Sequence, residues 1–199
     1  MDIKQIPLAP IGANCYIFTD GTGHAAIVDP GGEPGRVLAL VREMDVKVDA
    51  IFLTHGHFDH TGGAAELRSA LACKVYLHPG DRALLGTQVM PDVGPTADYV
   101  DGDHVQVGAI DVEVIHTPGH TPGGVTLKAG NALFTGDTLF KGSMGRTDLP
   151  GGSYEVLMRS LRRLGELEGD YKVLSGHEGV STLNAERKSN YYLLEAMSD

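Results

Sequence analysis

The segment THGHFDH, from Thr54 to His60, places several metal-binding side chains within six consecutive residues. They are His55, His57, Asp59 and His60. Imidazole and carboxylate groups are the ligands that hold zinc, iron or manganese in proteins. Because the whole chain of 199 residues contains only nine histidines, three of them so close together are rare by chance. We therefore interpret the segment as part of a metal site.

Other candidate ligands each follow an apolar run. The run AIFLT precedes His55, VEVIHTPG precedes His120, NALFTG precedes Asp137, and YKVLSG precedes His177. Such runs are typical of strands, and loops at one end of a sheet are where functional sites are built. The pattern predicts that these four loops meet at one edge of a β-structure.

The elements that must position these loops alternate between strand and helix patterns. Helical spacing of apolar residues predicts helices over 33–44, 64–72, 153–167 and 185–197, with Ser153 as an N-cap. Strands are expected at 15–20, 25–30, 50–54, 74–78, 104–107, 110–115, 124–128, 131–135 and 171–175. Both hairpin-like and βα connections occur, so the predicted sheet is mixed.

Length and charge narrow the functional class. We expect one domain spanning residues 1–199, because this length suits a single buried core. A formal net charge of -10 disfavours nucleic acid as a partner. No apolar run is long enough for a membrane span, and the N-terminal segment does not resemble a secretory signal, so a cytoplasmic protein is expected. Two scattered cysteines, Cys15 and Cys73, are expected to stay reduced.

Four segments together resemble a known family. THGHFDH, HTPGHTPGG, GDTLF and SGHEG, in this order, resemble the metallo-β-lactamase superfamily, and the chain is similar within it to glyoxalase II (hydroxyacylglutathione hydrolase) and its short relatives. The resemblance covers nearly the whole chain. It implies an α/β (α+β) fold, an αββα sandwich of two mixed β-sheets flanked by helices.

The resemblance also implies a ligand set for two divalent metal ions, with zinc expected first and iron or manganese as alternatives. One ion would be held by His55, His57 and His120. The second would be held by Asp59, His60 and His177. Asp137 would bridge the two ions, and Asp59 and Asp137 are the carboxylates assigned to catalysis.

Two further residues are expected near the ligands rather than among them. HTPGH contains two histidines, and the family places its ligand at the second, so we assign His120 as the ligand and His116 as an outer partner. Asp29, at the end of AAIVDP, is a candidate carboxylate for orienting a ligand, with a turn-capping role as the alternative.

The expected reaction is hydrolysis of a thioester of the hydroxyacylglutathione type by a metal-bridging hydroxide. The sequence has no GxSxG nucleophile motif. Arg146 aligns with a substrate-binding lysine of glyoxalase II, whereas Asp148 stands where that family has an aromatic residue. The additional C-terminal substrate-binding domain of full-length glyoxalase II is not expected here. The expected partner is a small-molecule thioester, and no membrane partner is expected. The chain is expected to be a monomer or homodimer.

Two alternatives remain open. The segment GRTD after GDTLF resembles the persulfide dioxygenases of the same superfamily, which bind a single iron, here through His55, His120 and Asp137. Hydrolysis of another ester or of a lactone is the second alternative.

Overall fold

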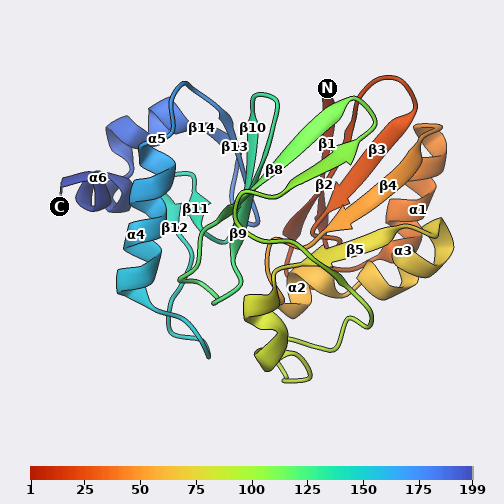
Figure 1. Cartoon of the computed structure of the whole chain (residues 1–199), viewed down its shortest axis with the longest axis horizontal. Helices are drawn as coiled ribbons and strands as arrows, with labels where there is room; N and C mark the ends of the chain where they lie inside the picture. Colours follow the sequence, from red (N-terminus) through yellow and green to blue (C-terminus); the bar gives the residue numbers. More distant parts are fainter. Residues whose placement is uncertain (199) are drawn as a thin grey trace.

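A computed structural model describes residues 1–198, which form two six-stranded mixed β-sheets packed face to face with helices on both outer sides (Figure 1). The first sheet has the order β1-β2-β3-β4-β5-β6. Its strands are β1 (Asp2–Leu8), β2 (Ala13–Thr19), β3 (His24–Val28), β4 (Lys47–Phe52), β5 (Lys74–Leu77) and β6 (Ala97–Asp98). The pairs from β3 to β6 are parallel, and the others are antiparallel.

The second sheet has the order β14-β13-β10-β9-β8-β7, and only β10 and β13 pair in parallel. Its strands are β7 (His104–Val107), β8 (Ile110–His116), β9 (Val125–Ala129), β10 (Ala132–Gly136), β13 (Lys172–Ser175) and β14 (Ser181–Thr182). A small hairpin, β11 (Leu139–Phe140) with β12 (Ser143–Met144), follows β10.

Helices cover the outer face of each sheet. On the first sheet these are α1 (Pro34–Glu43) and α3 (Ala64–Leu71), which lie in the crossovers between parallel strands. On the second sheet they are α4 (Tyr154–Gly165), α5 (Leu183–Ser189) and α6 (Tyr191–Ser198). Two short elements, α2 (Phe58–Thr61) and the 3₁₀ helix η1 (Pro79–Leu84), lie in loops near one edge of the sandwich. The predicted αββα arrangement of mixed sheets is confirmed.

The alternation of side chains along β2 shows why the layers hold together. Cys15 and Ile17 point to the cluster beneath α1 and α3, whereas Tyr16 and Phe18 point to the other sheet. Every residue of β2 is buried, because both faces of the strand are covered. Between the sheets, Phe134 of β10 stacks on Phe18 with ring centroids 5.3 Å apart. Burial of apolar side chains on both faces of each sheet is the main stabilising contribution.

Several sequence predictions of local structure can be compared with these elements. Ser153 does cap α4, because its hydroxyl accepts a hydrogen bond from the backbone N–H of Val156 at 3.4 Å. The single helix predicted over 185–197 is wrong. The chain leaves the helical conformation at Asn190, whose side-chain oxygen accepts from the N–H groups of Tyr192 and Leu193 and so caps α6. Strand β1 was not predicted, because its polar edge residues hide the β pattern.

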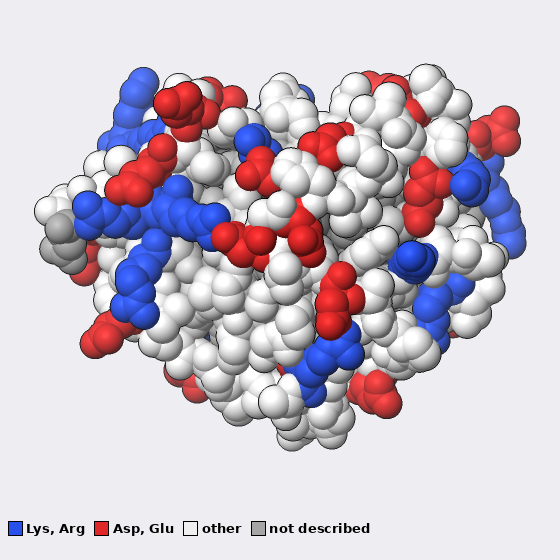
Figure 2. All heavy atoms as spheres, viewed as in Figure 1, with Lys and Arg blue, Asp and Glu red and all other residues white. Residues whose placement is uncertain are grey.

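Acidic and basic side chains are interspersed on the face shown in Figure 2 rather than separated into large patches. Several of the basic groups are paired with acids. Arg163 lies 2.7 Å from Asp101, and Lys128 lies 2.9 Å from Glu113. Among residues 1–198, no helix combines the length and the apolar character that a membrane crossing requires.

Candidate metal centre

The register of the strands brings the predicted ligand loops together. In the parallel pair β10–β13, Gly136 lies opposite Ser175, so Asp137 and His177 leave the sheet at the same edge. Gly136 has φ 46°, and a Cβ there would lie 2.3 Å from Oγ1 of Thr54. The end of β10 therefore packs directly against the start of the histidine segment, a close approach that only glycine allows.

The histidine segment itself folds as a turn followed by one helical turn. His57 is the extended N-cap residue of α2, and Asp59 and His60 lie within that helix. This change of backbone conformation directs the first two histidines and the last two ligand candidates to different sides of one point. Four neighbouring side chains can therefore contribute to two separate clusters.

The first cluster consists of His55, His57 and His120, whose ligand atoms all lie within 4.8 Å of one another. Each of the three residues is at most 4 % exposed. Nδ1 of His57 lies 2.9 Å from Nε2 of His120. Burial, together with the neighbouring histidines, lowers the pKa of His57 to about 4 and lowers that of His55 as well. The imidazoles of His55 and His57 are therefore neutral at pH 7, which is the form that binds metals.

The second cluster consists of Asp59, His60 and His177, which also lie within 4.8 Å of one another. Nε2 of His177 lies 3.1 Å from Oδ2 of Asp59, and Nε2 of His60 lies 3.4 Å from the same oxygen. Burial alone would raise the pKa of Asp59, but the hydrogen bond with His177 and the nearby imidazole of His60 outweigh it and lower that pKa. Asp59 is therefore ionised and can serve as a ligand.

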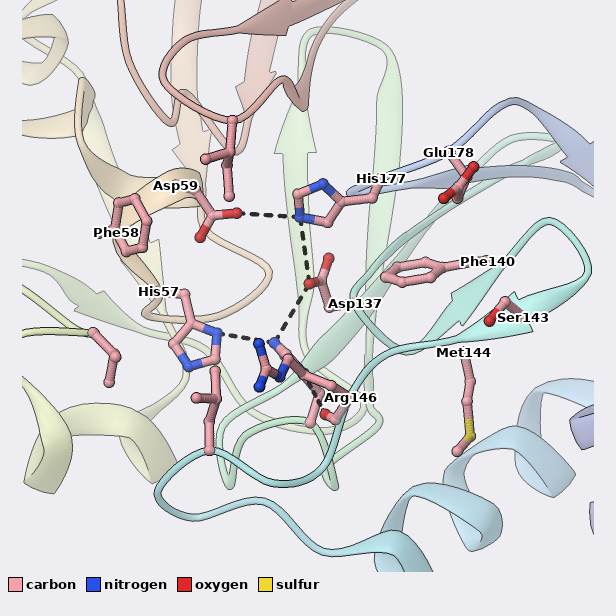
Figure 3. A pocket seen from close by; sticks show the side chains of 14 residues that line it. His57, Phe58, Asp59, Asp137, Phe140, Ser143, Met144, Arg146, His177 and Glu178 are labelled. Carbon is pink, nitrogen blue, oxygen red and sulfur yellow. Dashed lines mark hydrogen bonds and ion pairs between the residues drawn. The ribbon is translucent and has the colours of Figure 1, made fainter.

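Asp137 lies between the two clusters (Figure 3). Its Oδ2 is 3.4 Å from Nε2 of His120 in the first cluster and 3.6 Å from Nε2 of His177 in the second. Its Oδ1 is 3.4 Å from Nε2 of His60. The side chain is 9 % exposed. This is the position that a carboxylate shared by two metal ions would occupy.

Unpaired polar atoms test whether these residues fit metal ions. Among the described residues, the buried side-chain atoms without a hydrogen-bond partner are Nε2 of His55, His57 and His60, together with Oδ1 of Asp137. Every one of them belongs to a candidate ligand. A buried polar atom without a partner is costly. The donor set of imidazoles and carboxylates and these unpaired atoms therefore fit divalent metal ions.

Asp29 lies directly behind the second cluster. Its carboxylate accepts hydrogen bonds from the backbone N–H and the hydroxyl of Thr54, at 2.7 and 2.6 Å, and lies 2.9 Å from Nδ1 of His60. Burial would lower the pKa of His60, but the carboxylates of Asp137 and Asp29 outweigh it and raise that pKa. Asp29 is thus placed to orient the His60 ring.

The two histidines of HTPGH have different surroundings. His120 belongs to the first cluster, and its Nδ1 lies 2.7 Å from the backbone oxygen of Arg146. The ring of His116 lies outside the clusters and stacks on that of His78, with centroids 4.1 Å apart and planes 12° apart. Its Nε2 lies 2.9 Å from the carbonyl oxygen of Pro122, within the His120 loop.

A cavity of about 440 Å³ opens onto the candidate ligands (Figure 3). Besides His57, Asp59, His120, Asp137 and His177, it is lined by Ile11, Phe58, Val89, Phe140, Ser143, Met144, Arg146, Leu149 and Glu178. The only basic side chain among these non-ligand lining residues is that of Arg146. Its guanidinium forms two hydrogen bonds of 2.6 Å with Asp148. Beyond the candidate ligands the cavity wall is therefore mainly apolar, with one cation, Arg146, and one carboxylate, Glu178.

Sequence reasoning missed two features of this region. Glu178 follows His177 in a left-handed conformation, with φ 67°, and lines the cavity. Asp81 is fully buried and joins two of the ligand loops. The motif SGHEG places Glu178 beside a ligand and could have indicated it. Nothing in the sequence around Asp81 singles it out.

The chain is similar to known proteins in sequence and in fold. The family model of the metallo-beta-lactamase superfamily matches residues 8–177. Hydroxyacylglutathione hydrolase GloC of Haemophilus influenzae is 34 % identical, with 97 % of this chain and 98 % of that protein aligned.

Two solved structures are also similar. One is that of the B3 metallo-beta-lactamase BLEG-1, with a TM-score of 0.90, 33 % identity, and coverage of 96 % of this chain and 99 % of the other. The second is TTHA1623 in a di-iron-bound form, with a TM-score of 0.83, 37 % identity, and coverage of 95 % and 99 %. The matched fold and sequence, together with the clustered histidines and aspartates, show that this chain belongs to the metallo-beta-lactamase superfamily.

Proposed function

We propose that this protein is a metal-dependent hydrolase that cleaves an acyl thioester of the hydroxyacylglutathione type. One observation carries the proposal: Asp137 lies within 3.6 Å of histidines from both candidate metal clusters, at the base of a cavity. The similarity to hydroxyacylglutathione hydrolase GloC supports the choice of substrate class.

The cofactor that we propose is a pair of divalent ions, zinc in the first place. His55, His57 and His120 would hold one ion, Asp59, His60 and His177 the other, and Asp137 both. The similarity to a di-iron protein makes iron the first alternative to test, and manganese the second. When bound, such a pair supplies a hydroxide nucleophile near neutral pH and polarises the carbonyl of the substrate.

The chain's own groups then have defined tasks. Asp59 and Asp137 are the two carboxylates that face the cavity among the ligands, so they can orient the attacking water by accepting its hydrogen bonds. The apolar wall, which includes Phe140 and Met144, excludes water from the acyl group. Arg146 is the cation available to a substrate carboxylate, provided that it exchanges its contact with Asp148.

The cavity does not favour a protein nucleophile. Ser143 carries the only hydroxyl among the side chains that line it, and no cysteine is among them. Within residues 1–198, Ser143 makes no side-chain hydrogen bond to a histidine that could act as its base. Attack by water is therefore the simplest reaction that this set of residues supports.

We also propose that the protein acts in the cytoplasm on a small molecule, as a monomer or homodimer, without nucleic acid or membrane. The net charge of -10 and the mixed surface in Figure 2 support a partner other than a phosphate backbone.

A panel of substrates tests the proposal. Zinc-loaded protein should release free thiol from S-lactoylglutathione, and removal of metal with a chelator should abolish the release. A β-lactam, a simple ester and a lactone belong in the same panel, because a B3 metallo-beta-lactamase is among the similar structures. If no acyl thioester yields thiol while one of the other substrates is hydrolysed, the proposed substrate class is wrong.

A mononuclear iron persulfide dioxygenase is the second candidate. The segment GRTD, residues 146–148 with the preceding glycine, carries the resemblance, and His120 and Asp137 lie 3.4 Å apart as two of the three ligands required. Oxygen consumption with glutathione persulfide and iron-loaded protein is the discriminating assay. Oxygen uptake without any thiol release from thioesters would favour the dioxygenase.

A further inference from the structure

A buried carboxylate lies between the loops that carry the three-histidine cluster. Asp81 belongs to η1 and is 0 % exposed. Its Oδ2 accepts hydrogen bonds from the backbone N–H of Gly56 at 2.8 Å and from the hydroxyl of Thr121 at 3.0 Å. Its Oδ1 accepts from the backbone N–H of Gly123 at 2.6 Å. A single side chain thus joins two loops that are more than sixty residues apart in sequence.

These two loops hold the members of one cluster. Gly56 lies between His55 and His57, and Thr121 directly follows His120. The groups that Asp81 binds therefore flank ligands of the three-histidine cluster and not those of the second cluster. The second cluster has its own carboxylate, Asp29, beside His60.

The chemistry of the contact requires a carboxylate. All three partners of Asp81 donate a hydrogen bond, so the group between them must only accept. An amide would turn an NH₂ group towards at least one of these donors, at a cost of about 1–3 kcal/mol for the group left unpaired. There is also no spare room, because a Cβ at Gly123 would lie 2.7 Å from Cγ of Asp81.

The segment that carries Asp81 is itself held against the His120 loop. The ring of His78 accepts a hydrogen bond from the N–H of Gly80 at 3.1 Å and stacks on His116. A Cβ at Gly80 would lie 2.8 Å from the carbonyl oxygen of Pro122. Asp81 is therefore presented by a segment that packs closely against the His120 loop.

We propose that Asp81 is a positioning residue that fixes the spacing between the His55–His57 turn and the His120 loop and thereby sets the metal affinity of the three-histidine cluster. The inference rests on the metal centre of the proposed function and not on its substrate. Loss of the carboxylate should affect one ion of the pair, because the second cluster is not among its contacts.

Zinc affinity of the Asp81→Asn variant, measured by competition with a chelator, tests the inference. We expect one of two bound ions to be held about 10- to 100-fold more weakly, the range found when outer partners of metal ligands are removed, and the other to be unchanged. Thr121→Val removes one of the three donors and should weaken the same ion by less. This experiment measures zinc affinity and not thiol release, so its result does not depend on whether the proposed substrate is correct.

The matched control is Glu186→Gln. Glu186 is also a buried carboxylate, 2 % exposed, that accepts from the backbone N–H of Gly142 at 2.7 Å and from the side chain of Asn190 at 2.8 Å. It belongs to neither cluster. This variant should lose thermal stability without a change in zinc affinity, which separates general destabilisation from an effect on the metal.

Two variants that each keep only one intact cluster identify which of the two ions is weakened. With His177→Ala, which leaves the three-histidine cluster intact, Asp81→Asn should weaken the remaining ion. When Asp81→Asn is combined with His57→Ala, which leaves the second cluster intact, it should not change the affinity for the remaining ion. Equal weakening of both ions, or the same loss of zinc in Glu186→Gln, would overturn the inference. If Asp81→Asn does not fold, an unchanged zinc affinity in Thr121→Val overturns it instead.

Discussion

At the scale of single residues, the proposed chemistry depends on Asp137 and the histidines around it. Both carboxylate oxygens of Asp137 face imidazole nitrogens, and these imidazoles come from both clusters. For a substitution at any candidate ligand, both the number of bound metal ions and the activity should therefore be measured. Residues that only surround the ligands should behave differently.

The two histidines of HTPGH provide such a comparison. His120→Ala should release one metal ion and reduce thiol release by several orders of magnitude, because it removes a ligand from the three-histidine cluster. His116→Ala should keep both ions and lower activity modestly, because His116 is not among the clustered residues and contacts the His120 loop through Pro122. Elemental analysis of both variants makes the measurement. A greater loss of metal in His116→Ala would reverse the assignment.

Arg146 is expected to act on binding rather than on the chemical step. Arg146→Ala should raise KM about five- to tenfold and change kcat little, since a remote charge contact is worth about 1 kcal/mol when exposed. Steady-state kinetics with S-lactoylglutathione make the comparison. Arg159→Ala, which replaces an arginine of α4 that does not line the cavity beside the candidate metal centre, controls for net charge. A fall in kcat with KM unchanged would exclude the role in binding.

At this scale, candidate ligands could be recognised from the sequence where they lie close together along the chain. His55, His57, Asp59 and His60 could be recognised as candidate ligands, because four metal-binding side chains rarely fall within six residues by chance. Asp81 could not be found, since its partners include backbone N–H groups of two distant loops. Nothing in the sequence shows that such donors will converge on one carboxylate.

At the scale of elements, strand ends and helix contacts place the loops. The start of α4 is capped by Ser153, and its residue Arg163 binds both Asp101 and the carbonyl oxygen of His116. The helix is thus tied to the loop that continues into HTPGH. Strands with continuous apolar runs could be predicted. The break at Asn190 could not, because asparagine within a good helical pattern is weak evidence for a helix end.

The pair Asp101–Arg163 predicts a dependence of stability on pH. Hydrogen bonds from Arg163 hold the pKa of Asp101 below its ordinary value of 3.8. A lowered pKa contributes stability above the ordinary value, and this contribution disappears as the pH falls through the lowered one. Asp101→Asn should therefore lower the free energy of unfolding at pH 7, by less than about 1 kcal/mol because both groups are partly exposed.

Urea unfolding at neutral and acidic pH measures this difference. The gap between the wild type and Asp101→Asn should shrink as the pH falls. Asp2→Asn, at an exposed terminal acid, controls for the change in net charge. A gap that stays constant or widens in acid would contradict the role assigned to the carboxylate.

Asn190 links the C-terminal helices to the cavity. Its side-chain NH₂ donates to the carbonyl oxygens of Phe140 and Ser143 in the β11–β12 hairpin, at 3.2 and 2.9 Å. Asn190→Ala leaves these carbonyls without a buried donor, so it should destabilise the fold by about 1–3 kcal/mol. It should also raise KM while both metal ions are retained, because Phe140 and Ser143 line the cavity. Loss of metal in this variant would show that the hairpin also supports the ligands.

At the scale of the whole molecule, the sandwich gathers the candidate ligands from both sheets at one edge. Asp29 and His55 follow strands of the first sheet, whereas His120, Asp137 and His177 follow strands of the second. The sequence alone predicted alternating strands and helices, and the resemblance to a family supplied the packing of two sheets. Periodicity could not give that packing, because it shows that a strand is buried but not which layer covers it.

Reconstitution of metal-free protein tests the central claim most directly. Zinc is added back in known ratios to the chain, and thiol release from S-lactoylglutathione is measured at each ratio. The two clusters joined by Asp137 predict that activity rises until about two ions are bound per chain and then levels off. Full activity with a single ion per chain, or no thiol release at any zinc loading, would contradict hydrolysis at a dinuclear centre.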